Sequence, residues 1–87
     1  MVEFQMIVYE PKIWTLYIHE NKINNKKYVG ITSVNPKKRW ANGNGYSDSQ
    51  YISKAIKKYG WDNFNHIILY NKLTCSEACF LEKLYIK

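Results

Sequence analysis

Two tyrosines stand where a β-hairpin could bring their phenols together. Tyr17 and Tyr28 lie in the alternating, β-forming segments 14–18 and 28–32. If the apolar faces of the two segments match, both phenols share the opposite face, beside Gly30, which leaves open space. Phenols next to bare backbone would make a floor for a substrate. The alternative is that the two tyrosines only pack on the sheet, as paired tyrosines commonly do.

An acidic residue interrupts an apolar face of the last predicted helix. Residues at steps of three and four form that face, namely Cys75, Ala78, Cys79, Glu82 and Ile86. A carboxylate in such a stripe is destabilising unless it is paired, hydrogen-bonded or bound to a metal. Glu82 is therefore a candidate ligand for a hard cation such as Mg²⁺ or Mn²⁺. The alternative places it at the edge of the stripe, in contact with solvent or a lysine.

One basic residue differs in kind from the others. Arg39 is the only arginine among thirteen basic residues. Its planar, permanently charged guanidinium suits phosphate oxygens better than an ammonium does. Because Arg39 falls in a short predicted helix just after the strand that carries Tyr28, it could reach the same face. A surface salt bridge is the alternative.

The composition indicates a small basic domain with an anionic partner. The 87 residues carry thirteen Lys and Arg against seven Asp and Glu, a net charge of +6. Such charge density favours nucleic acid, although lysine-rich surfaces also serve solubility alone. An apolar content of 46% supports one modest core, and no apolar run is long enough to span a membrane. Two cysteines are too few for a secreted disulfide scaffold, so we expect a cytoplasmic protein.

Three strands and three helices must position these residues. A hairpin of segments 14–18 and 28–32 encloses the asparagine-rich loop 20–26, and segment 64–70 is a third strand. Residues 1–13 are expected to be an N-terminal arm or an extra edge strand. The three helices are predicted from capping residues, which are, in order, Asn35 followed by Pro36, Ser47 with Gln50, and Thr74 with Glu77.

The second helix carries an apolar stripe and a stop signal. Gly60 ends it, and the stripe consists of Ile52, Ala55, Ile56 and Tyr59. The order of elements is strand, strand, helix, helix, strand, helix. It predicts an α+β fold, with a small three-stranded, mostly antiparallel sheet flanked by about three helices.

The spacing of these residues is similar to that of a known family. Leu-Tyr-Ile at 16–18 and Tyr-Val-Gly at 28–30 place ten residues between their tyrosines. Lys26 stands two positions before Tyr28, and Arg39 stands eleven positions after it. Segment 55–64 matches the family's helix exit into a third strand, and Glu82 takes the place of its metal-binding glutamate. Residues 14–87 thus resemble the GIY-YIG endonuclease superfamily, most closely its small phage- and mobile-element-type members.

The resemblance implies a divalent-metal-dependent DNA endonuclease. Glu82 would hold Mg²⁺ or Mn²⁺, and Arg39 would neutralise charge that develops on the phosphate. Tyr17 would be the general base, with Lys26 assisting, because an ordinary phenol with a pKa of about 10 is a poor base at neutral pH. Tyr28 would position the water or the phosphate.

DNA is the expected partner, and we expect no contact with a membrane. The residues expected to face DNA are Lys37, Lys38, Tyr46, Lys54, Lys57 and Lys58. Sequence preference would come from an additional DNA-targeting domain or a partner. Tyr46 is the aromatic residue in this set. It would stack on bases, and the alternative is that it packs in the protein interior.

The sequence departs from the family pattern at one position that concerns the chemistry. Several relatives carry a histidine four residues after the arginine, where this chain has Gly43. Neither His19 nor His66 fits that position by sequence, whereas Asn42 or Tyr46 could substitute. A second hypothesis is therefore a nucleic-acid-binding module that keeps the fold with weak or absent catalysis. Zinc binding by the two cysteines and two histidines is disfavoured, because their spacing is not that of a zinc finger.

Overall fold

A computed structural model of the protein describes residues 12–48 and 50–86. Residues 1–11 of the expected N-terminal arm therefore lie outside the described part. The elements are, in order, β1 (Trp14–Asn21), β2 (Lys27–Thr32), α1 (Pro36–Trp40), η1 (Ala41–Gly43), α2 (Tyr51–Tyr59), η2 (Trp61–Asn63), β3 (Phe64–Leu73) and α3 (Cys75–Tyr85). The two η elements are single 3₁₀ turns. The predicted α+β fold and its β-β-α-α-β-α order are confirmed.

The sheet is antiparallel and has the strand order β2-β1-β3. In the hairpin Tyr17 pairs with Gly30, and His19 pairs with Tyr28. Because side chains alternate along a strand, Tyr17 and Tyr28 share one face, as the sequence predicts. On the other side of β1, His19 pairs directly with His66 of β3. β3 runs to Leu73, three residues past its predicted end.

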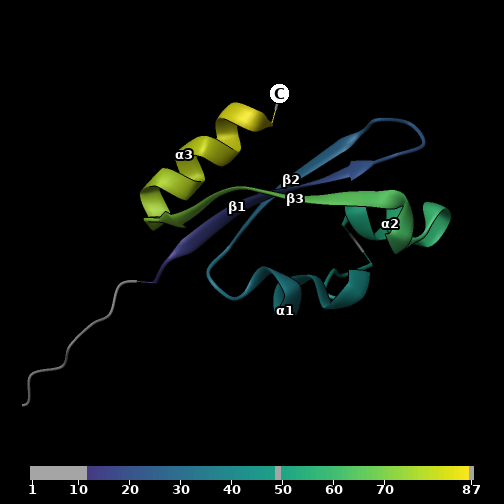
Figure 1. The fold of residues 1–87 in the computed structure, drawn as a ribbon, viewed down its shortest axis with the longest axis horizontal. Coiled ribbons are helices and arrows are strands. Elements are labelled where there is room, and N and C mark those ends of the chain that lie inside the picture. Colours follow the sequence, from purple (N-terminus) through teal and green to yellow (C-terminus); the bar gives the residue numbers. More distant parts are fainter. Residues whose placement is uncertain (1–11, 49, 87) are drawn as a thin grey trace, which may run out of the picture.

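Helices cover both faces of the sheet. Figure 1 shows α3 on one side and α1 and α2 on the other. On the α2 side, Ile52 and Ala55 form a buried cluster with Phe64, against which Tyr28 and Tyr59 pack. This agrees with the predicted apolar stripe of the second helix. No helix among the described residues is long and apolar enough to cross a membrane.

Local signals account for most helix ends. The Asn35 side chain accepts a hydrogen bond from the Lys37 backbone N–H at 2.9 Å, and Pro36 opens α1. Thr74 and Glu77 form the predicted capping box at the start of α3. Gly60 ends α2 with φ of +88°, a conformation that side-chain-bearing residues rarely adopt.

The predicted start of the second helix is wrong. α2 begins at Tyr51, with Gln50 as its cap residue. Ser47 and Gln50 instead close a separate turn, in which the Gln50 N–H donates to the Ser47 carbonyl at 3.0 Å. The Gln50 side-chain oxygen also accepts from the Ser47 N–H at 3.0 Å. The reciprocal contact of a capping box thus stabilises a turn that precedes the helix.

The predicted apolar stripe of the last helix is also wrong in part. Within α3 only Ala78 is buried, whereas Cys75 and Cys79 are exposed. Leu81 and Glu82 are half-buried. The helix therefore rests on the sheet through Ala78 and the residues three and four positions beyond it, and the two thiols face away.

Candidate active site

One pocket of about 210 Å³ gathers most of the predicted site residues. Four consecutive residues of β2, from Tyr28 to Ile31, line it. Because consecutive strand residues point to opposite faces, the pocket wraps around the edge of β2 that faces away from β1. The remaining lining residues come from β1, α1, the following loop, α2 and α3, and are Tyr17, His19, Arg39, Tyr46, Gln50, Ile52 and Glu82.

Gly30 is necessary for the position of Tyr17. A Cβ atom built on Gly30 would lie 2.6 Å from both Cζ and Oη of Tyr17. Only a residue without a side chain leaves room for the phenol at that point of the strand pair. The open space predicted beside Gly30 is thus filled by the Tyr17 ring itself, which is 3% exposed.

Arg39 is held by contacts other than an ion pair. Its Nη1 donates to the carbonyl of Gly45, and its guanidinium lies 4.5 Å from the centroid of the Tyr46 ring. The ion pairs among the described residues are Lys27–Glu20 and Lys57–Asp48, so the alternative of a salt bridge does not hold for Arg39. The positive charge remains available to an anion in the pocket.

Glu82 reaches the same pocket from the opposite side of the sheet. Its side chain is half-buried, and within residues 12–48 and 50–86 no hydrogen bond or ion pair engages the carboxylate. The alternative in which a lysine neutralises Glu82 therefore does not hold for the described lysines. A carboxylate and a guanidinium thus line one pocket, and neither has a charged partner in the described part of the chain.

The arrangement suits a cation that needs few protein ligands. The described residues contain no group of three or more His, Cys, Asp or Glu side chains placed to hold a metal. Mg²⁺ commonly binds one or two carboxylates and completes its shell with water and substrate phosphates. The single carboxylate of Glu82 fits that mode, and the two exposed cysteines of α3 do not line the pocket.

His19 is a site residue that the sequence reasoning missed. It lines the pocket, is 1% exposed, and has Trp40 and Trp61 against its ring at centroid distances of 5.0 and 5.1 Å. Burial, followed by the positive charges of His66 and Arg39, lowers the pKa of His19 to about 3. Strand alternation could have found it, because His19 is two residues from Tyr17 on one strand.

Tyr46 lies inside the site, although we expected it to face DNA. It is half-buried, and its hydroxyl donates to Tyr17 Oη at 3.2 Å. The same hydroxyl lies 2.6 Å from His19 Nε2. Burial, with the hydrogen bond to Tyr17 as the next cause, raises the pKa of Tyr46. These hydroxyl contacts therefore indicate a role for Tyr46 within the site and do not indicate stacking of its ring on bases.

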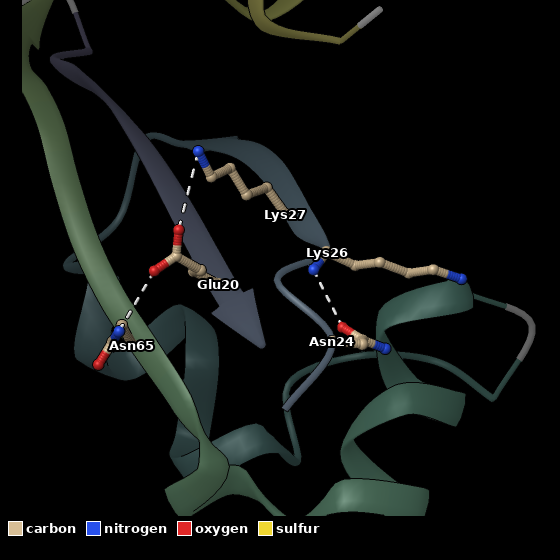
Figure 2. Close-up of polar contacts among 5 residues, drawn as sticks. All are labelled: Glu20, Asn24, Lys26, Lys27 and Asn65. Carbon is tan, nitrogen blue, oxygen red and sulfur yellow. Dashed lines mark hydrogen bonds and ion pairs between the residues drawn. The ribbon is translucent and has the colours of Figure 1, made fainter. Parts of the chain in front are cut away.

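Lys26 does not join the pocket. Its side chain is exposed, and its backbone N–H donates to the Asn24 side chain at 3.0 Å. Figure 2 shows the side chain extending away from the neighbouring Lys27, which pairs with Glu20 at 3.7 Å. The assistance to Tyr17 predicted for Lys26 therefore has no geometric support.

The lysines predicted to face DNA come from two helices on one side of the sheet. All are exposed, and they lie on α1 (Lys37, Lys38) and on α2 (Lys54, Lys57, Lys58). Figure 1 places both helices on the side opposite α3. Lys57 is engaged with Asp48 at 2.6 Å, and Lys58 lies 5.2 Å from the centroid of the Tyr59 ring.

Comparison with known proteins establishes the class to which this fold and pocket belong. Residues 13–87 match the model of the GIY-YIG catalytic domain, so the chain belongs to the GIY-YIG family. The resemblance seen in the tyrosine motifs is thereby confirmed.

A phage protein is similar to this chain in amino-acid sequence. The chain is 38% identical over 68 residues to "Putative endonuclease segE" of Enterobacteria phage T4. The match covers 78% of this chain and 31% of the phage protein, so the chain spans about a third of that relative's length. No solved structure gives a significant match to this chain.

Proposed function

We propose that residues 14–87 form a divalent-metal-dependent endonuclease domain that hydrolyses phosphodiester bonds in DNA. The proposal rests on the pocket at the β2 edge, where Arg39 and Glu82 lie beside Tyr17 and Tyr28 and neither is paired with a charged side chain of residues 12–48 or 50–86. Membership of the GIY-YIG family supports the reaction class. Residues 1–13 would be an arm or an extra edge strand outside this domain.

Glu82 would hold one Mg²⁺ or Mn²⁺ ion. The ion would supply Lewis-acid stabilisation of charge on the scissile phosphate and on the leaving 3′ oxygen. The role of the protein is to present one half-buried carboxylate at the pocket wall, unpaired with any described lysine or arginine.

Arg39 would bind the non-bridging oxygens of the phosphate. Its contacts with Gly45 and the Tyr46 ring orient the guanidinium before a substrate arrives. A preoriented cation stabilises charge as it develops and needs little reorganisation during the reaction.

Tyr17 would take a proton from the attacking water. Its oxygen already accepts a hydrogen bond from Tyr46, and that bond would stabilise a phenolate at this position. Tyr28, on the same face of the hairpin, would position the water or the phosphate. Attack at phosphorus with loss of the 3′ oxygen would leave 5′-phosphate and 3′-hydroxyl ends. Lys26 has no part in this scheme, because its exposed side chain lies outside the pocket.

The exposed lysines of α1 and α2 would bind the DNA backbone without reading its sequence. Target choice would then rest on a further domain or a partner. The match covers 31% of the phage relative, which is consistent with a catalytic domain that works beside a separate targeting domain.

The test is a plasmid-nicking assay in Mg²⁺, Mn²⁺ or EDTA, with wild type beside Glu82→Gln. Glutamine keeps the size of the side chain and removes its charge. We expect metal-dependent nicking that falls at least about 100-fold in the variant, with unchanged DNA affinity in a salt titration. Cleavage by Glu82→Gln at the wild-type rate would remove the proposed role of Glu82.

A second candidate is a binding module on the same fold, favoured by Gly43 at the position where relatives carry a histidine. It predicts salt-sensitive DNA binding without cleavage in either metal. Metal-dependent turnover by the wild type, abolished by EDTA, would reject it.

A further inference from the structure

Four side chains form a continuous hydrogen-bonded chain that starts in the pocket. Tyr17 Oη and Tyr46 Oη are 3.2 Å apart, and Tyr46 Oη lies 2.6 Å from His19 Nε2. On the other edge of the same imidazole, His19 Nδ1 lies 2.9 Å from Nδ1 of His66. The register of the sheet holds the last contact, because His19 and His66 are directly paired residues of β1 and β3.

The chain connects two separate pockets through an interior of aromatic rings. Tyr17 lines the candidate active site, whereas half-buried His66 lines a second pocket of about 310 Å³. Trp61 stacks on His66 at a centroid distance of 3.7 Å and an interplanar angle of 20°. Trp40, which is 7% exposed, packs against the rings of Tyr17, His19 and His66. Of the middle members, His19 is 1% exposed and Tyr46 is half-buried at the wall of the candidate active site, whereas the far end of the hydrogen-bonded chain opens at a different surface.

Every member of the chain can both donate and accept a proton. In the observed arrangement, the Tyr46 hydroxyl donates to Tyr17. The proton between Tyr46 and His19 must then belong to His19 Nε2, and His19 Nδ1 must accept a hydrogen bond from His66. Rotation of the two hydroxyls and a change of tautomer on both imidazoles reverses all three bonds. The reversed chain leads from Tyr17 outward to His66.

The interior members are suited to passing a proton and poorly suited to holding a charge. The lowered pKa of His19 disfavours its imidazolium, and the raised pKa of Tyr46 disfavours its phenolate; burial is the main cause of both. Each must therefore accept one proton as it releases another, His19 at its two ring nitrogens and Tyr46 at its single oxygen.

We infer that Tyr46, His19 and His66 form a proton relay that carries the proton taken up at Tyr17 out to the pocket beside Trp61. The inference rests on the proposed nuclease function. In the reversed chain, the water oxygen bonds to phosphorus as the P–O3′ bond breaks, and the leaving 3′ oxygen takes a proton from solvent. The O–H bond of the attacking water breaks in the same step, and its proton goes to Tyr17 Oη. Tyr17 passes its phenolic proton to Tyr46, Tyr46 passes its own to His19 Nε2, and His19 releases Nδ1–H to His66. The resulting His66 imidazolium loses a proton to solvent, so Tyr17 need not be a phenolate beforehand.

The relay is tested at its outer end, where His66 is half-buried and replacement should not unfold the domain. His66→Gln keeps a side chain that can hydrogen-bond to His19 but cannot transfer a proton. Asn65→Ala is the matched control, because Asn65 is the exposed neighbour of His66 on β3 and lines neither of the two pockets. We expect single-turnover cleavage by His66→Gln to fall about 10-fold or more, with DNA affinity unchanged and the control at the wild-type rate.

Rescue separates proton transfer from packing. His66→Ala leaves a space beside Trp61 that imidazole can enter, and added imidazole should restore most of its cleavage rate while leaving His66→Gln slow. If His66→Gln cleaves within twofold of wild type, the relay is wrong and the nuclease assignment stands. If the wild type itself shows no metal-dependent cleavage, the nuclease assignment is what fails.

A second measurement tests the hydrogen-bonded series from Tyr17 to His66 without any turnover. Nitrogen NMR of the histidine rings should find His19 neutral at pH 5.5 to 7, with one ring N–H that exchanges slowly with water. The charged groups that act on this pair are Arg39 at His19 and Lys22 and Asp62 at His66. A His19 ring that titrates near pH 6.5, as free histidine does, would overturn the relay.

Discussion

The two sides of the sheet contribute to one pocket in different ways. On the α1–α2 side, Tyr17, His19 and Trp40 are each less than one-tenth exposed and are in ring contact, and the Tyr46 hydroxyl connects Tyr17 and His19 by hydrogen bonds. On the α3 side, a helix with one buried residue, Ala78, carries Glu82 to the pocket, while Phe80 stays 63% exposed. The groups proposed to bind phosphate and move protons are thus locked by packing, whereas the proposed metal ligand depends on how one helix docks.

The largest effect should follow from breaking the locked side at Gly30. Gly30→Ala places a methyl group 2.6 Å from Tyr17 Oη and Cζ, so the phenol must move. We expect cleavage to fall about 100-fold and stability to fall by about 1–3 kcal/mol from overpacking. Nicking rates and thermal melts measure both. Tyr17→Phe, which removes only the hydroxyl, should lose cleavage with a smaller change in melting temperature; equal cleavage by Gly30→Ala and wild type would refute the close fit.

The docking of α3 can be weakened without touching Glu82. Ala78 is 0% exposed, so Ala78→Leu pushes the helix away from the sheet. Overpacking should destabilise the domain by about 1–3 kcal/mol, and cleavage should fall about 10-fold as Glu82 shifts. Chemical denaturation and nicking are the measurements. Ser76→Leu adds the same side chain at an exposed position of α3 and should leave both unchanged.

Acid should lower the stability of the domain through His19, which is buried on the α1–α2 side. The folded-state pKa of His19 is lowered from 6.5 to about 3, so between these values the unfolded chain binds more protons and stability falls as pH falls. The expected slope for His19 is about 1.4 kcal/mol per pH unit below 6.5, with burial of His66 adding in the same direction. Denaturation midpoints from pH 7 to 5 measure it. A flat profile would mean that His19 is charged in the folded state.

The smallest effect concerns the first turn of α3. Thr74→Ala removes the capping contact to the Glu77 N–H at 3.1 Å and should destabilise the domain by about 1 kcal/mol. Thr74→Ser keeps the hydroxyl and should retain most of that stability. Cleavage should change little in either variant, because the cap lies two turns from Glu82. A loss of cleavage as large as that of Ala78→Leu would show that fraying at Thr74 controls the docking of the whole helix.

Local patterns predicted the elements well because local physics governs them. Asn35, Gly60 and Thr74 end or begin helices through contacts with backbone groups a few residues away. The failure at Ser47 and Gln50 has the same origin, since the side chain and backbone contacts that open a helix also close a turn. The misplaced stripe of α3 shows the limit of periodicity, which does not say which flank of a short helix meets the sheet.

Two features of the site could be predicted from the order of residues: the strand pairing that puts Tyr17 and Tyr28 on one face, and the motif spacing typical of the family. Alternation and turn length suffice for both, because they act between neighbours along the chain. The meeting of Glu82 and Arg39 at one strand edge, from opposite sides of the sheet, depends on how the helices pack and could not be read from local patterns. The same holds for the contact of His19 with His66, 47 positions away, because the register between β1 and β3 arises from packing of the whole sheet.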